Sequence, residues 1–224
     1  MKKVALGIVC LLMLFSMMIS CKEEPTEPEI PDREYVESEV IGAAEELLLD
    51  SNKINSILWG VGLPTSQSED AIKNGSYTQI DEEAANSLLI FCVEDIRALC
   101  RSVYAKDICQ MAERTVFSPV KDSENNIISL VRYYDYTPKD EQTKESVLMI
   151  NNKSTVYFKR DVTYHTETIK VVDVEGEIIH LCVEVTVYNE EDQSQKRTLS
   201  FSLIEEEGLW RLASPTYMTY ISNK

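Results

Sequence analysis

The spacing of apolar residues separates a helical first half of the chain from a strand-rich second half. Between residues 36 and 59, apolar positions recur at intervals of three and four, which is typical of one buried face of an amphipathic helix. These positions are Val36, Val40, Ala43, Ala44, Leu47, Leu48, Ile54, Ile57 and Leu58. Gly60, Gly62 and Pro64 then predict the end of the helix. The polar run 50–52 is a candidate interruption, because short polar side chains compete for backbone hydrogen bonds.

A second helical zone is predicted between residues 90 and 117. It carries two apolar stripes separated by a break at 104–107, and Pro119 ends it. The break predicts two helices, the second of which can fold back on the first.

Beyond residue 126 the apolar period changes to two. Strands are predicted at 126–136, 147–150, 155–159, 162–174, 179–187, 196–204 and 209–213. Glu175 and Gly176 suit a two-residue hairpin loop. Helices followed by such a run predict an α+β fold, with the N-terminal helices packed on a curved antiparallel meander sheet of about five to six strands.

The first 20 residues have the organisation of a secretory signal peptide, with a short basic start followed by the uncharged apolar stretch 4–19. The run Met18-Ile19-Ser20-Cys21 resembles the processing site of bacterial lipoproteins. This resemblance implies cleavage before Cys21 and attachment of a diacylglycerol, which carries fatty acyl chains such as palmitate, to its sulfur. The protein would then be anchored at the extracytoplasmic face of the cell membrane without spanning it. An uncleaved N-terminal anchor is the alternative.

Three segments follow from these patterns. Residues 1–20 are the predicted signal peptide, residues 21–34 comprise the lipidated cysteine and an acidic, proline-rich tether, and residues 35–224 form a single α+β domain. Proline and like-charge repulsion keep such a tether extended.

Charge and motifs exclude several classes of function. The formal net charge of −16 makes nucleic acid an improbable partner, because phosphate binding needs a clustered positive field. Neither a Rossmann glycine motif nor a P-loop occurs, so no cofactor is expected. The two histidines show no H-E-x-x-H spacing and the cysteines no C-x-x-C spacing, so no metal site is expected.

Four cysteines follow the predicted lipidation site: Cys92, Cys100, Cys109 and Cys182. If the second helix of the 90–117 zone folds back, Cys100 and Cys109 can meet and form a disulfide. Buried free thiols are the alternative, since cysteine is among the most buried residue types.

Tyrosines in and beside the predicted strands form a candidate binding surface. Tyrosine offers apolar area with a polar tip, which suits recognition. The candidates are Tyr133, Tyr157, Tyr164, Tyr188 and Tyr217. Packing in the core or at the sheet edge is the alternative role for these rings.

Catalytic chemistry has only weak candidates. His180 and Cys182 share one face of a strand, but a nucleophile and its base normally come from separate elements. The alternative is a small hydrolase or isomerase with a cone-shaped cavity, which would require a base and a nearby acid. The candidates are His165 or His180 as the base and Glu184 as the acid. We assign no catalytic residue and do not expect an enzyme.

Three stretches carry a resemblance to a known family: Trp59-Gly60-Val61-Gly62-Leu63-Pro64, residues 95–107, and the Trp-Arg-Leu-x-Ser-Pro-Thr-Tyr run at 210–217. In this order they resemble exported lipoproteins of clostridial type, whose function is unassigned. The arrangement is also similar to cystatin-like and nuclear-transport-factor-like cone folds, and distantly to the secreted inhibitor of cell-wall DL-endopeptidases. The family carries no assigned activity, so the expected function follows from the residues themselves. The tethered address, the tyrosine-rich strands and the lack of a convincing nucleophile, metal set or phosphate loop favour a non-catalytic binding or regulatory module at the cell envelope. Its expected partner is an envelope protein or peptide, and inhibition of a cell-wall hydrolase is one form this regulation can take.

Overall fold

The computed structural model describes residues 33–121, 124, 127–138, 146–151, 153, 162–188 and 194–216. By its internal contacts the chain divides into two units, Met1–Val36 and Glu37–Lys224. The first unit contributes only the opening residues of helix α2 to the described structure. Three residues singled out in the sequence, Cys21, Tyr157 and Tyr217, lie outside the described residues.

The protein is α+β, as predicted. The helices are α2 (Arg33–Leu58), α3 (Glu82–Leu88), α4 (Val93–Val103) and α5 (Lys106–Ala112), and α5 continues into the π-helical turn η1 (Glu113–Phe117). The strands are β1 (Lys73–Asn74), β2 (Tyr77–Gln79), β3 (Val120–Lys121), β4 (Ile127–Ser129), β5 (Tyr133–Tyr136), β6 (Val147–Asn151), β7 (Val162–Glu175), β8 (Ile178–Tyr188), β9 (Ser194–Glu206) and β10 (Leu209–Leu212).

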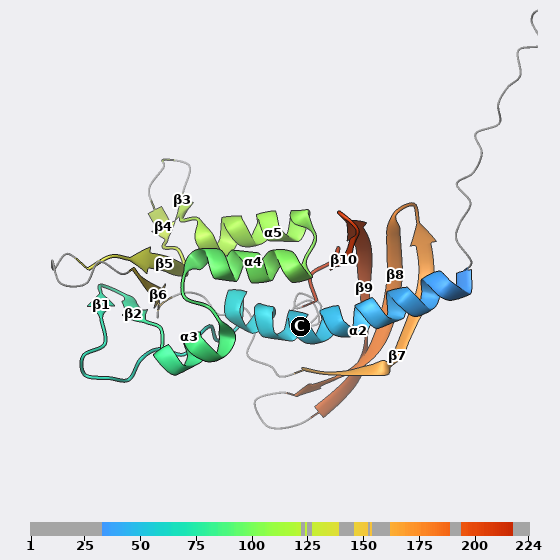
Figure 1. Cartoon of the computed structure of the whole chain (residues 1–224), viewed down its shortest axis with the longest axis horizontal. Coiled ribbons are helices and arrows are strands. Elements are labelled where there is room, and N and C mark those ends of the chain that lie inside the picture. The colour runs from blue at the N-terminus through green and yellow to red at the C-terminus, as the bar shows by residue number, and fades with distance from the viewer. Residues whose placement is uncertain are drawn as a thin grey trace, which may run out of the picture. The chain divides into compact units, whose positions relative to one another are not determined.

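The strands form two four-stranded antiparallel sheets and a short two-stranded ribbon. The last four strands make the predicted meander, in the order β10-β9-β8-β7, and the second sheet has the order β1-β2-β6-β5. Figure 1 shows the meander beside one half of α2 and the second sheet beside the other end of that helix. The strands predicted at 126–136 and 147–150 therefore do not extend the meander, and the strand predicted at 155–159 lies outside the described residues.

Helix α2 links the two sheets through specific side chains. In its middle, Asn52 donates a hydrogen bond from Nδ2 to the carbonyl oxygen of Val162 at the start of β7, 3.0 Å away. In its last turn, the carbonyl oxygen of Ile57 accepts a hydrogen bond of 2.9 Å from the Tyr133 hydroxyl on β5. One helix thus supplies a packing surface to both sheets.

The candidate interruption at 50–52 does not occur, because α2 is continuous through it. Ser51 is fully buried, and its hydroxyl donates to the carbonyl oxygen of Leu48 at 2.8 Å. The Ser51 side chain therefore bonds to the backbone without interrupting the helix. The predicted break near residue 104 does occur, with Tyr104 and Ala105 in extended conformation between α4 and α5.

The core lies between α2 and one face of the meander. On β8 the odd-numbered residues are buried, and the buried residues of β9 are odd-numbered as well. This is the alternation that the period-two pattern predicts. The buried meander residues on these strands are Ile179, Leu181, Val183, Val185, Val187, Leu199, Phe201 and Leu203. None of the helices within the described residues is both long and apolar enough to cross a membrane.

Leu47 and Leu49, two residues apart on α2, give a test of which helix face is buried. Leu47 is 8% exposed and Leu49 is 54% exposed. We expect Leu47→Ala to lower the free energy of unfolding by about 2 to 3 kcal/mol, through lost burial and the cavity left behind. Leu49→Ala should change it by less than about 0.5 kcal/mol. Urea denaturation of both variants measures this difference, and equal losses would contradict the assigned face.

Candidate functional site

The three tyrosines named from the sequence that lie within the described residues do not come together as one surface. Tyr133 is 1% exposed, and its hydroxyl lies between the backbone of Ile57 and the amide of Leu63. Tyr164 is 8% exposed and faces the core from β7. We therefore correct the expectation for these two rings, whose role is core packing, the alternative already considered. Tyr188, at the end of β8, is 38% exposed.

A different set of tyrosines gathers on the outer face of the second sheet. The rings of Tyr77 and Tyr134 meet edge to face with their centroids 4.5 Å apart, and those of Tyr134 and Tyr136 lie 6.1 Å apart. All three are half-buried, and we call them the tyrosine cluster. Hydrogen bonds fix the first two rings: the Tyr77 hydroxyl donates to Val131 and the Tyr134 hydroxyl accepts from Asn74.

The sequence held a signal for this cluster in the run Tyr133-Tyr134-Asp135-Tyr136. Side chains alternate along a strand, so Tyr134 and Tyr136 must share the face opposite Tyr133. Tyr77 joins them only through the pairing of β2 with β6 and of β6 with β5. That pairing connects segments more than fifty residues apart, and local pattern does not specify it.

The histidines lie on the outward face of the meander. His165 faces Glu184 in the strand register, but its Nε2 is 2.8 Å from the Thr186 hydroxyl. His180 has its Nδ1 2.9 Å from the Ser202 hydroxyl. Each imidazole is therefore held by a neighbouring hydroxyl on an adjacent strand.

The carboxylates nearest to the histidines are solvent-exposed. Glu167 is 3.8 Å from His165 Nδ1, and Glu175 is 3.7 Å from His180 Nε2. The two carboxylate side chains are 74% and 84% exposed. A general base is usually desolvated and aimed into a cleft, whereas these pairs are exposed surface contacts worth little energetically.

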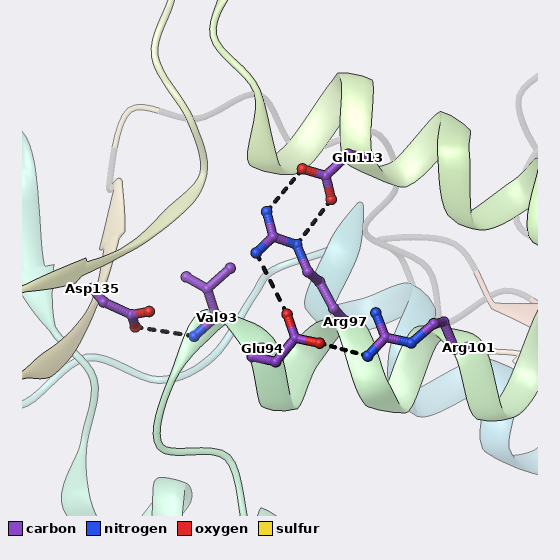
Figure 2. A network of polar contacts seen from close by, with 6 residues as sticks. All are labelled: Val93, Glu94, Arg97, Arg101, Glu113 and Asp135. Atoms are coloured by element: carbon purple, nitrogen blue, oxygen red, sulfur yellow. Dashed lines mark hydrogen bonds and ion pairs between the residues drawn. The ribbon is translucent and has the colours of Figure 1, made fainter.

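A polar network crosses the helical hairpin formed by α4 and α5. The Arg97 guanidinium donates two hydrogen bonds to the Glu113 carboxylate, from Nε at 2.9 Å and from Nη2 at 2.8 Å. Glu94 lies between Arg97 and Arg101, at 3.6 Å and 2.6 Å. Figure 2 shows this chain of charges running along α4 and across to η1. The Arg97 guanidinium also lies over the Phe117 ring, 5.0 Å from its centroid.

The network perturbs the acidities of its members in the direction that favours ionisation. The hydrogen bond from Arg101 holds the pKa of Glu94 below its ordinary value, and the hydrogen bond to Glu113 raises that of the Arg97 guanidinium. The bidentate pair joins α4 to the π-helical turn, so it fixes the angle between the two arms of the hairpin.

The start of α4 is held by two carboxylates. Asp95 accepts hydrogen bonds from the amides of Phe91 and Cys92, and Asp135 on β5 accepts from the amide of Val93 at 3.0 Å. Figure 2 shows this last bond joining the helix to the second sheet. Orphan amides at a helix start are satisfied in this way, and the pKa of Asp95 is lowered chiefly by the Phe91 amide.

The hairpin brings Cys100 and Cys109 together. Their sulfurs are 3.5 Å apart, and both residues, like Cys92 and Cys182, are free thiols in this structure. The fold-back anticipated from the sequence is therefore present. Within the described residues, no group of three or more His, Cys, Asp or Glu side chains is placed to hold a metal ion.

The first stretch that carried the family resemblance has a packing role. Trp59 is buried against Tyr104, with ring centroids 6.2 Å apart, and Arg132 donates from Nη2 to the carbonyl oxygen of Gly60 at 2.6 Å. Gly62 has a φ of +85°, which ordinary side chains rarely adopt. These residues form the turn after α2 and do not form a cavity for a ligand.

The last stretch also serves the fold. Leu212 and Thr216 are fully buried, and the Ser214 hydroxyl accepts a hydrogen bond of 2.9 Å from the amide of Ser202. Trp210, by contrast, is only half-buried. No protein-family model matches the chain, and comparison with curated proteins found none of similar sequence.

Proposed function

We propose that the protein is a lipid-anchored lipoprotein at the extracytoplasmic face of the cell membrane, where its domain acts by binding an envelope protein or peptide rather than by catalysis. Inhibition of a cell-wall hydrolase is the form of regulation we propose for it. The sequence of residues 1–34 supports the proposed location at the membrane. The surface of the domain supports the proposed mode of action.

The observation that carries the binding proposal is the tyrosine cluster. Half-buried aromatic rings bound by hydrogen bonds to their own sheet are rigid, so little side-chain entropy is lost when a partner covers them. Tyrosine is enriched among the residues that dominate binding energy at protein interfaces. The neighbouring amide of Asn74 adds a polar group at the edge of the rings.

The proposed anchor is tested by replacing the lipidated residue. Cys21→Ser should abolish incorporation of a labelled fatty acid and release the protein from the membrane fraction of a bacterial host. The variant lacks the sulfur that accepts the diacylglycerol, and without its two acyl chains the protein loses the stable anchor, because a single chain gives only marginal, reversible membrane binding. Unchanged processing and full membrane retention of the variant would contradict lipidation.

The proposed binding function is tested by assaying murein hydrolysis by envelope hydrolases with and without the purified protein. We expect stoichiometric inhibition that Tyr134→Ala weakens by about thirtyfold, the effect of losing an interface residue worth about 2 kcal/mol. Tyr188→Ala, an exposed tyrosine on the other sheet, is the matched control and should leave inhibition unchanged.

Two further variants separate binding from catalysis. Inhibition that persists in His180→Ala and Cys182→Ala supports a binding module. Turnover of a small substrate that disappears with either change would replace the proposal with an enzymatic one. Equal loss of inhibition in Tyr134→Ala and Tyr188→Ala would show that the tyrosine cluster is not the interface.

A further inference from the structure

The two sulfurs in the helical hairpin differ in their accessibility. Cys100, in the last turns of α4, is 2% exposed, whereas Cys109 on α5 is half-buried. The Cys100 thiol points its hydrogen at the Cys109 sulfur across 3.5 Å. The Cys109 thiol in turn lies 3.4 Å from the carbonyl oxygen of Tyr104, in the break between the helices.

A half-open depression leads to this pair of thiols. Its volume is about 190 Å³, and its lining includes Arg97, Cys100, Arg101, Cys109, Ala112 and Phe117. A water molecule occupies about 30 Å³ of liquid, so the depression can hold a group of several heavy atoms. It is open to solvent on one side, so a small disulfide can reach the thiols from there.

The surroundings of the two thiols shift their pKa values in opposite directions. The pKa of Cys109 lies below its ordinary value, chiefly because the Cys100 thiol donates a hydrogen bond to its sulfur. Burial and Glu206 act in the opposite sense, and the nearby Arg101 and Arg211 add to the lowering. The pKa of Cys100 is raised by the same hydrogen bond and by burial. The accessible sulfur is thus the one that ionises more readily, and the thiolate is the attacking form of cysteine.

We propose that Cys109 and Cys100 form a thiol–disulfide exchange site for small dialkyl disulfides, in which Cys109 attacks and Cys100 resolves. This inference concerns a site separate from the tyrosine cluster and goes beyond the proposed binding function. It also goes beyond the disulfide expected from the sequence, because it assigns an order of reaction and a class of co-reactant.

The reaction proceeds in two balanced steps. The Cys109 thiolate attacks one sulfur of the disulfide RSSR; the S–S bond breaks, a mixed disulfide forms at Cys109, and the departing thiolate takes a proton from water. Cys100 then loses its proton to solvent and attacks the Cys109 sulfur, which releases the second RS⁻ as RSH. The protein dithiol is oxidised by two electrons, and RSSR is reduced to two RSH.

Little movement separates the dithiol from the product. The sulfurs have to approach from 3.5 Å to the bond length of about 2.05 Å, which is a shift on the scale of side-chain rotation. The π-helical turn η1 begins immediately after α5, and such turns are frequent at functional sites.

The experiment uses the full-length protein in detergent and bis(2-hydroxyethyl) disulfide, a small uncharged probe that matches the size of the depression. After acid quenching, alkylation and peptide mass mapping, we expect a Cys100–Cys109 disulfide and two equivalents of 2-mercaptoethanol, reversed by dithiothreitol. Cys109 should react at least about tenfold faster than Cys92 or Cys182, because the Cys100 thiol donates a hydrogen bond to the Cys109 sulfur, whereas burial raises the pKa of Cys92.

Single substitutions test the order of attack. Cys100→Ser keeps a hydroxyl donor beside Cys109 and should accumulate the mixed disulfide there, whereas Cys109→Ser should leave Cys100 unmodified. First reaction at Cys92 or Cys182, or a mixed disulfide in the wild-type protein that is never resolved, would overturn the proposal. The peptide mapping of the wild-type protein needs no variant, so it can contradict the proposal even if one of the variants fails to fold.

Discussion

Replacing Gly62 with alanine is expected to lower the free energy of unfolding by about 3 to 5 kcal/mol, whereas Gly75→Ala should lower it by only about 1 to 2 kcal/mol. Both glycines have positive φ angles, +85° and +61°. The left-handed conformation alone costs an L-residue about 1 to 2 kcal/mol. The two substitutions therefore share the backbone cost and differ in what the new methyl group meets.

The space around Gly62 is filled by three buried side chains. A Cβ at this position would lie 2.6 Å from Ile150 Cδ1, 2.7 Å from Arg132 Nη2 and 3.1 Å from the Tyr133 hydroxyl oxygen. Arg132 and Tyr133 cannot withdraw freely, because each already bonds the backbone of the turn. A Cβ at Gly75 has no heavy atom within 4 Å.

Chemical denaturation of the wild-type protein and the two variants measures this difference. Gly176→Ala, at the β7–β8 turn with a φ of +61° and open space, is a second control that should behave like Gly75→Ala. Equal losses for Gly62→Ala and the two controls would show that the turn after α2 can shift away from β5 and β6 without cost.

The elements with strong local periodicity were predictable from the sequence. The apolar stripe of α2 and the alternation along β8 each require only that one face be buried, so the pattern determines the element type. The break between α4 and α5 was predictable for the same reason, because the apolar stripe changes face there. The proximity of Cys100 and Cys109 follows from that break.

The division of the strands into two sheets was not predictable from these patterns. β5 and β6 were predicted as strands like those of the meander, but they pair with each other, and β6 also pairs with β2, which lies where no strand was predicted. Tyr133 was offered as a surface residue because nothing local distinguishes it from Tyr134. The Gly62 turn determines which of the two is buried, since its backbone binds the Tyr133 hydroxyl.

A buried polar network joins α2, the α4–α5 break and the C-terminal stretch. Asn55 donates from Nδ2 to the Thr216 hydroxyl at 2.7 Å, and Tyr104 donates to Asn55 Oδ1 at 2.6 Å. Thr216 donates to the Ser51 hydroxyl at 3.0 Å, and Ser51 donates to the carbonyl oxygen of Leu48. Every hydroxyl proton of the network therefore has an assigned acceptor, and the 3.0 Å contact between the Tyr104 and Thr216 hydroxyls requires no further proton.

Asn55→Ala is expected to cost about 2 to 4 kcal/mol of unfolding free energy. Asn55 is 2% exposed, so water cannot replace its amide without rearrangement of the core. The two hydrogen bonds of the amide are lost, and a single bond from the Tyr104 hydroxyl to the Thr216 hydroxyl, 3.0 Å away, can replace only one of them, so one buried bond worth about 1 to 3 kcal/mol is not recovered. The cavity left by the missing amide adds to this loss.

Equilibrium urea unfolding of Asn55→Ala, Thr216→Val and the double variant tests the network as a unit. Since both single changes break the same bond, the double variant should lose less than the sum of the two, by about 1 to 3 kcal/mol. Asn86→Ala, an exposed asparagine in α3, is the matched control and should change stability by less than about 0.5 kcal/mol. Strict additivity would mean that Asn55 and Thr216 stabilise the fold independently, and the C-terminal stretch would then be held by packing rather than by this hydrogen bond.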